Sequence, residues 1–224
     1  MDRGQIYQHL KDIYKRLVAT YGSQYWWPAK EPFEVIVGAI LTQSTAWRNA
    51  EQAIDNLRAA GALSPKAMRL LSFSKLAKII RPCGYYNVKA LRLKSMVNWL
   101  GNSHNDDLNN LFAFDVRDLR QQLLSIHGIG QETADSIILY AIRKPIFVID
   151  AYTRRITNRI GLTQSCNKYA DYQQLFMINL PADVQLFNEY HALLVRLAKD
   201  VCCKKSICDK CCLNKICRFY KTGR

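Results

Sequence analysis

Cysteines are the most closely clustered reactive residues in this chain of 224 residues, because six of its eight cysteines fall between residues 202 and 217. The N-terminus mixes charged and apolar residues and does not resemble a secretory peptide, so we expect an intracellular protein whose thiols stay reduced. Clustered cysteines in such a compartment more often bind metal than form disulfides. The run Cys208-x2-Cys211-x5-Cys217 therefore predicts a metal or metal-cluster site.

Zinc and iron-sulfur are the alternatives for this cysteine cluster. A structural zinc site usually has two short cysteine pairs separated by a longer loop, and only one Cys-x2-Cys pair occurs here. The pattern favours an iron-sulfur cluster, with zinc as the alternative.

Asp150 is the candidate for acid-base or electrostatic chemistry. It follows the apolar run 145–149, which we expect to be a buried extended connector, and it precedes a predicted helix that begins at Ala151. A carboxylate at this place caps a helix, and capping is the simpler interpretation. The same carboxylate is also able to stabilise positive charge that grows on a sugar, or to orient an attacking water.

Residues 119–142 predict two helices joined by the turn Gly128-Ile129-Gly130, with Thr133 in the first turn of the second helix. Glycines permit a sharp turn and bring backbone N–H groups and a helix N-terminus close to a phosphate oxygen. We therefore predict a helix-hairpin-helix, although an ordinary helix-helix turn has the same spacing.

The charge of the chain indicates a polyanionic partner. Lys and Arg number 32 against 18 Asp and Glu, which is a formal charge of +14. Residues 143–224 carry 15 basic and 6 acidic side chains, so +9 of this surplus lies near the C-terminus. Nucleic acid is the leading partner, and a merely solvated basic surface is the alternative.

Apolar residues recur at helical spacing nearly everywhere, so we predict an all-α fold. Helix boundaries are indicated by Ser64-Pro65 at one start and by Gly101 at one end. No segment approaches the roughly 20 apolar residues that span a bilayer, so we expect no membrane partner.

A family resemblance rests on three segments: Ile126-His127-Gly128-Ile129-Gly130, Thr133-Ala134 and Val148-Ile149-Asp150. Together they resemble the endonuclease III family of DNA glycosylases, which has the helix-hairpin-helix, Gly/Pro, Asp signature. The resemblance implies a two-lobe fold. In this implied fold, a six-helix barrel domain would span 31–145, and residues 1–30 would join 146–224 in a discontinuous iron-sulfur domain with its cluster loop at 202–217.

The resemblance also implies that the protein binds damaged duplex DNA, flips a base out of the helix and cleaves its N-glycosidic bond with the help of Asp150. Two residues depart from the family pattern. His127 stands where Pro is usual. Glu132 stands where bifunctional members carry the lysine that forms a Schiff base. The departure at Glu132 predicts a monofunctional glycosylase with absent or weak AP-lyase activity.

Aromatic residues near Pro28 carry a closer resemblance. Tyr25-Trp26-Trp27-Pro28, Trp47 and the run 81–87 are similar to 3-methyladenine DNA glycosylases of the endonuclease III type. By position, Trp27, Pro28, Trp47 and Glu132 are the implied substrate-binding residues. Gln43 would fill the gap left by the flipped base, and Tyr85 would wedge the opposite strand. An aromatic pocket favours a cationic alkylated purine.

Family spacing also identifies the cysteine cluster as a [4Fe-4S] site, because Cys208, Cys211 and Cys217 match its last three ligands. The usual first position falls on Val201, so we assign Cys202 as the fourth ligand, with Cys203 as the alternative. The other cysteines, Cys83, Cys166 and Cys212, receive no role. Basic residues interleaved with the ligands would face phosphates when the loop folds: Lys204, Lys205, Lys210, Lys215 and Arg218.

The sequence thus predicts a base excision repair glycosylase for alkylated purines, monomeric, cytoplasmic and nucleoid-associated. Two other functions remain open. One is a glycosylase for uracil, mismatched thymine or oxidised pyrimidines, and the other is a non-catalytic iron-sulfur DNA-binding or redox-sensing protein.

Overall fold

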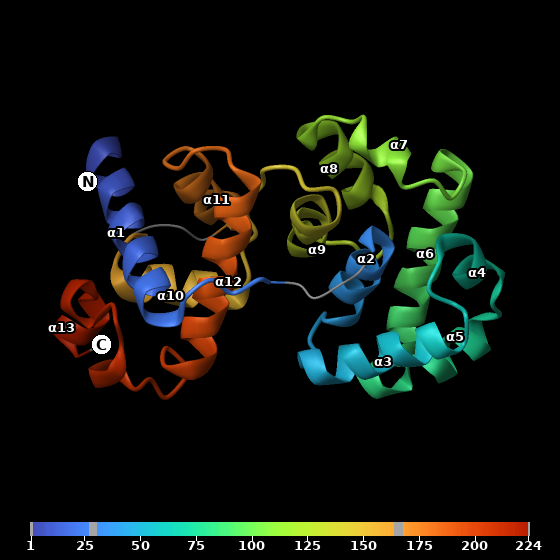
Figure 1. Cartoon of the computed structure of the whole chain (residues 1–224), viewed down its shortest axis with the longest axis horizontal. Coiled ribbons are helices and arrows are strands. Elements are labelled where there is room, and N and C mark those ends of the chain that lie inside the picture. Colours follow the sequence, from blue (N-terminus) through green and yellow to red (C-terminus); the bar gives the residue numbers. More distant parts are fainter. Residues whose placement is uncertain (1, 27–30, 164–167, 224) are drawn as a thin grey trace. The chain divides into compact units, whose positions relative to one another are not determined.

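The computed structural model describes residues 2–26, 31–163 and 168–223. The chain is 70% helical, and no strand occurs among the described residues, which confirms the predicted all-α class. None of the helices in these ranges is both long and apolar enough to cross a membrane. The chain divides into two compact units (Figure 1): Trp27–Lys144, and Met1–Trp26 with Pro145–Arg224. We call them the central unit and the terminal unit, and each is described by itself.

The central unit is built entirely from helices and short helical turns. In chain order these are α2 (Pro32–Leu41), α3 (Trp47–Ala59), α4 (Pro65–Leu70), α5 (Phe73–Ile79), the 3-10 turn η1 (Arg81–Cys83), α6 (Tyr86–His104), α7 (Asn109–Phe112), α8 (Val116–Ser125), α9 (Gln131–Ser136) and the π-helical turn η2 (Ile137–Ala141).

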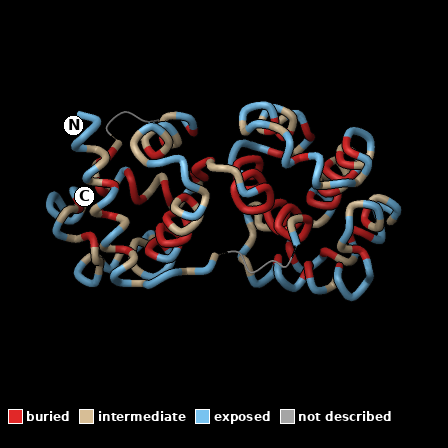
Figure 2. Tube along the Cα trace, turned by 45° about the horizontal axis from the view of Figure 1, so that its top comes forward, coloured by how far each residue is buried: buried red, intermediate tan, exposed pale blue. Residues whose placement is uncertain are grey.

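Helix α2 is the core of the central unit, because nine of its ten residues are buried. It is apolar all round and packs against α3, α6 and η2, as expected for a helix without a solvent-facing side. Its one buried carboxylate, on Glu34, accepts a hydrogen bond from Arg58 of α3 at 2.9 Å. Within the unit the buried residues lie inside and the exposed residues outside (Figure 2).

The terminal unit joins the first helix of the chain to its last third. Its elements are α1 (Arg3–Tyr21), α10 (Ala151–Ile160), α11 (Tyr169–Met177), α12 (Val184–Asp200), the 3-10 turns η3 (Cys208–Lys210) and η4 (Asn214–Ile216), and α13 (Arg218–Thr222). Helix α1 buries Leu10, Ile13 and Leu17 and packs on α12. The Tyr190 hydroxyl donates to the Leu10 carbonyl at 2.9 Å, which ties the two helices across 180 residues of sequence.

Helix boundaries follow the predicted capping signals with one exception. Ser64 caps α4 by accepting a hydrogen bond from the Ala67 N–H, and Pro65 takes the first helical position. Gly101, however, does not end α6, which continues to His104. The predicted boundary was wrong because Gly101 serves packing: a Cβ there would lie 2.6 Å from Nε of Arg69, so the missing side chain makes room for a guanidinium.

Candidate functional site

The predicted hairpin consists of α8 and α9, joined by residues 126–130. Gly128 has a φ of +83°, and a Cβ there would come within 2.3 Å of the Arg92 side chain, so both conformation and space demand glycine. Gly130 differs, because its φ is −90° and a Cβ would meet no heavy atom within 4 Å. The sharp turn therefore needs only Gly128, whereas Gly130 leaves open space beside the N-terminus of α9.

An ion pair ties the two hairpin helices together. Arg120 of α8 donates to both carboxylate oxygens of Asp135 of α9, at 2.6 and 3.2 Å. The Asp135 side chain is fully buried, and the Arg120 side chain is 24% exposed. Such a bidentate pair fixes the angle between the helices as well as their distance.

Gln43 is bound to the hairpin. Its Nε2 donates to the Thr133 hydroxyl at 2.8 Å and to the Gly128 carbonyl at 3.2 Å, while its Oε1 accepts a hydrogen bond from Arg92. Thr133 is buried, so its hydroxyl meets Gln43 rather than solvent. The turn after α2 and the hairpin thus form one hydrogen-bonded unit.

The other predicted residues of the central unit lie near helix starts. Tyr85 precedes α6, is 75% exposed and has a φ of +44°. Trp47 is the first residue of α3 and is half-buried. Glu132 lies exposed in the first turn of α9. Trp27 and Pro28 lie outside the described residues.

Asp150 belongs to the terminal unit, at the end of the connector 145–149. Residues 146–149 of the connector are buried, as predicted, and belong to no helix or strand, and the Phe147 ring stacks on Phe176 with centroids 3.9 Å apart. Side chains of α11 form hydrogen bonds with the backbone of the connector: the Ile149 N–H donates to the Tyr169 hydroxyl, and Gln173 donates to the Phe147 carbonyl. A buried and hydrogen-bonded connector therefore delivers Asp150 to the start of α10.

The Asp150 carboxylate has two different environments. Its Oδ1 caps α10 by accepting the Thr153 N–H at 2.6 Å, as the capping interpretation predicts. Its Oδ2 lies 3.7 Å from Nε2 of His191 on α12, and the Asp150 side chain is 13% exposed. Burial lowers the pKa of His191, and the nearby Asp150 charge opposes that shift only in part, which favours the neutral imidazole.

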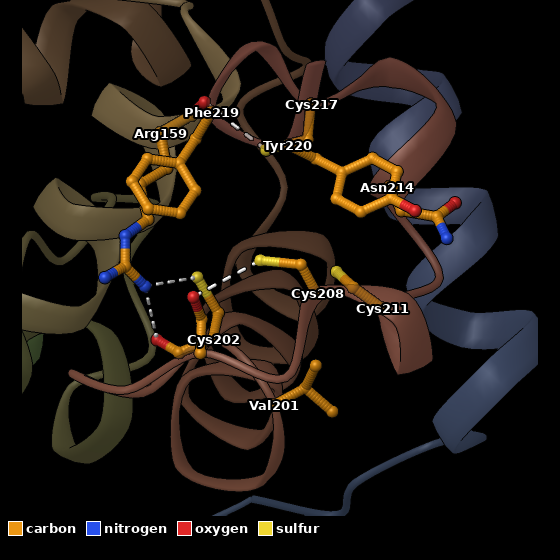
Figure 3. Close-up of a pocket in the computed structure, with 10 residues that line it drawn as sticks. Arg159, Val201, Cys202, Cys208, Cys211, Asn214, Cys217, Phe219 and Tyr220 are labelled. Carbon is orange, nitrogen blue, oxygen red and sulfur yellow. Dashed lines mark hydrogen bonds between the residues drawn. The ribbon is translucent and has the colours of Figure 1, made fainter. Parts of the chain in front are cut away.

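Four cysteines line one hollow of the terminal unit. They are Cys202, Cys208, Cys211 and Cys217, and Figure 3 shows the first three around one side of the hollow with Cys217 across from them. Cys203 and Cys212 are not among its lining residues. In the part of the chain that the structure describes, no three His, Cys, Asp or Glu side chains are grouped to hold a single metal ion. A single metal ion needs its ligands close together, whereas the iron and sulfide atoms of a polynuclear cluster hold the ligands farther apart. Cysteines placed around a shared hollow therefore fit a cluster.

Arg159 of α10 organises the cysteine loop. It donates to the carbonyl of Cys203 at 2.8 Å and to Sγ of Cys202 at 3.3 Å, and its guanidinium lies over the Phe219 ring (Figure 3). The interleaved basic residues are all exposed, as predicted: Lys204, Lys205, Lys210, Lys215 and Arg218.

Two residues of these sites were not predicted from the sequence: Arg92 and His191. Each lies on a long helix, with no motif around it that indicates chemistry. Only their contacts reveal them, because Arg92 and His191 meet Gln43 and Asp150 across 49 and 41 residues of sequence.

Known proteins match this chain over most of its length. Residues 37–181 match the model of the HhH-GPD superfamily of base excision DNA repair proteins. A protein of Methanocaldococcus jannaschii, named provisionally as a DNA repair glycosylase, is 43% identical over 94% of this chain and 96% of its own length. Endonuclease III of Sulfolobus acidocaldarius is 29% identical over 96% and 95%, and a thymine/uracil-DNA glycosylase of Pyrobaculum aerophilum is 27% identical over 98% and 95%.

Solved structures of DNA glycosylases also resemble this chain. H. pylori 3-methyladenine DNA glycosylase bound to 1,N6-ethenoadenine is 27% identical, with a TM-score of 0.72 over 89% of this chain and 98% of that chain. A trapped endonuclease III–DNA covalent intermediate has a TM-score of 0.82 over 97% and 98% at 17% identity, which shows a shared fold.

Proposed function

The chain belongs to the HhH-GPD superfamily of base excision DNA repair proteins, and we propose that it excises alkylated purines from duplex DNA as a monofunctional glycosylase. That it is a DNA glycosylase with DNA as its partner follows from the family. The lesion, the missing lyase step and the residue roles are our proposal.

The observation that carries the proposed mechanism is the environment of Asp150. Its Oδ1 accepts the Thr153 N–H, and its Oδ2 lies 3.7 Å from Nε2 of His191, whose pKa is lowered by burial. The carboxylate would stabilise the sugar, which becomes positively charged as the base departs. An alkylated purine is itself cationic and leaves as a neutral molecule, so one carboxylate and little general-acid help suffice.

Glu132 supports a reaction without a Schiff base. It occupies the position of the lyase lysine, in the first turn of α9, and a carboxylate is unable to form an imine with the opened sugar. We infer that water is the nucleophile, oriented by Asp150, and that the product is an intact strand with an abasic site.

The proposed substrate class rests on aromatic side chains and on one relative. Trp47, with Trp27 and Pro28 of the undescribed segment, would stack on the flipped base, and ring faces attract a cationic purine. The H. pylori protein named as a 3-methyladenine glycosylase is 27% identical over 98% of its chain. Gln43 would fill the gap left by the flipped base, and the exposed Tyr85 would wedge the opposite strand.

We further propose that Cys202, Cys208, Cys211 and Cys217 hold a [4Fe-4S] cluster, because these four line one hollow whereas Cys203 does not. The cluster would stabilise the fold of a loop that carries several exposed lysines. These lysines would bind DNA phosphates without recognising the base sequence. Protein purified without oxygen should absorb broadly in the visible range, and a colourless protein with stoichiometric zinc would contradict this assignment.

A panel of lesions tests the substrate class. We expect release of 3-methyladenine from methylated duplex DNA, and no comparable release from duplexes carrying uracil opposite guanine or thymine glycol. Excision of uracil or thymine glycol without 3-methyladenine would refute the substrate class but leave the role of Asp150 intact. If Asp150→Asn releases base as fast as the natural protein, the proposed mechanism fails.

Borohydride trapping tests the missing lyase step. We expect no covalent protein–DNA adduct with the natural protein, and an adduct with Glu132→Lys, which restores an amine at the family position. Efficient trapping by the natural protein would show that another amine attacks the sugar.

A further inference from the structure

Lys89 is a buried cation in the central unit. Its side chain belongs to α6, and the residue is only 1% exposed. An ammonium has three donors, and all three are used: Nζ donates to the Leu41 carbonyl at 2.8 Å, to the Cys83 carbonyl at 2.8 Å and to the Thr45 hydroxyl. None of the three partners is an acid.

The three partners belong to two turns that are far apart in sequence. Leu41 and Thr45 lie on either side of the turn that carries Gln43, and Cys83 lies two residues before Tyr85. The Thr45 hydroxyl also donates directly to the Cys83 carbonyl at 2.7 Å. Lys89 is therefore the point at which the turn of Gln43 and the turn of Tyr85 are joined.

Both turns contain a residue in the left-handed region. Ser44, next to Gln43, has a φ of +53°, and Tyr85 has a φ of +44°. Such conformations are unfavourable for residues other than glycine and persist only where surrounding contacts hold them. The ammonium of Lys89 makes contacts of this kind to both turns.

Burial of Lys89 is unfavourable by itself. Desolvation lowers its pKa, and the cation has dipoles instead of a carboxylate as partners. An apolar side chain would fill the same interior without this cost, but it would remove the Lys89 donor from the Leu41 carbonyl and leave the Cys83 carbonyl with the Thr45 hydroxyl alone. A lysine at this position is therefore explained by the hydrogen bonds that it donates to the two turns, and not by packing of the core.

We propose that Lys89 is a positioning residue that holds Gln43 and Tyr85 at a set spacing, so that both enter the duplex together. This inference rests on the proposed function, because it takes these two side chains as the ones that enter the DNA. Lys89 itself is buried and needs no contact with DNA.

Lys94 is a matched control on the same helix. Like Lys89, it donates to uncharged oxygens, here the carbonyls of Met68, Arg69 and Leu71, and burial also lowers its pKa. These partners lie at the end of α4, away from Gln43 and Tyr85 in sequence. Lys94→Met thus removes a half-buried lysine with three oxygen partners on the same helix without touching either turn.

The test uses a duplex with a tetrahydrofuran abasic analogue and 2-aminopurine opposite it, so that entry of the two side chains unstacks the fluorescent base. Lys89→Met should lower the ratio of unstacked to stacked complex about tenfold, as expected from the loss of one or two net hydrogen bonds. Lys94→Met should leave it unchanged, and both variants should bind undamaged duplex equally. Equal effects of the two variants, or a loss confined to affinity for undamaged duplex, would overturn the proposal.

Thr45→Val covers the case in which Lys89→Met does not fold. It removes the hydroxyl between Nζ and the Cys83 carbonyl and should lower the same ratio about fivefold; an unchanged ratio would count against the proposal. Gln43→Ala and Tyr85→Ala separate this inference from the proposed function. If they lower the signal but the Lys89 and Thr45 variants do not, the positioning role alone fails. If they leave the signal unchanged, the proposed entry of Gln43 and Tyr85 fails, and the role of Lys89 with it.

Discussion

Substitution of Asp150 separates its two tasks, because one oxygen caps α10 and the other faces the cleaved bond in the proposed mechanism. Asn and Asp are about equally good helix caps, so Asp150→Asn keeps an oxygen for the Thr153 N–H but removes the charge. Asp150→Ala removes both. Comparison of the two variants therefore isolates the charge from the cap.

The expected magnitudes differ for stability and for catalysis. Loss of the cap in Asp150→Ala should lower the free energy of unfolding by about 1 kcal/mol, which for a chain of this size lowers Tm by roughly 2–4 °C. Asp150→Asn should change Tm by less than this. Both variants lose a half-buried carboxylate that faces the growing positive charge in the proposed mechanism, and kcat should fall about 10²–10³-fold in each, or roughly 2.7–4 kcal/mol.

Single-turnover base release and thermal denaturation of the same preparations measure the two quantities. A rate for Asp150→Asn within about tenfold of the natural protein would refute the electrostatic role, because one order of magnitude equals only about 1.4 kcal/mol. A Tm for Asp150→Asn as low as that of Asp150→Ala would refute the division of labour between the two oxygens.

Three further predictions follow from single side chains. Cys202→Ser should abolish the visible absorbance of the anaerobic protein, whereas Cys203→Ser should retain it, and the reverse result would reassign the fourth ligand. Phe147→Ala should lower the free energy of unfolding by about 3–5 kcal/mol in denaturant titrations, because the ring is fully buried and stacked on a neighbouring ring; a change below about 1 kcal/mol would show that the connector is not held by this contact. Burial lowers the pKa of His104, so the unfolded chain binds its proton more readily, and stability should fall as pH drops below about 6.5. His104→Gln should weaken that dependence and leave the part that comes from the buried His191, and an unchanged slope would contradict the assignment.

The helical class and the chemical groups were readable from the sequence because they depend on local rules. Apolar spacing, Ser64-Pro65 and the Asp150 cap act within one or two turns of chain, so periodicity and capping indicate them directly. Gly101 shows the limit of these rules. A glycine indicates a helix end only if no packing contact requires the absence of a side chain. At Gly101 the side chain of Arg69, 32 residues away in sequence, occupies the space that a Cβ would need.

By itself, the sequence determined the hairpin, the capping carboxylate, the cysteine spacing and the family. Tertiary structure decided which groups lie together: Gln43 bonds to Thr133, Asp150 lies beside His191, and Cys202 rather than Cys203 lines the hollow that the other three cysteines line. The physical reason is that these contacts join helices distant in the chain, and no local preference encodes the partner. Lys89 is the clearest case. No motif marks this lysine in the sequence, but in the structure it is buried and hydrogen-bonds to both turns.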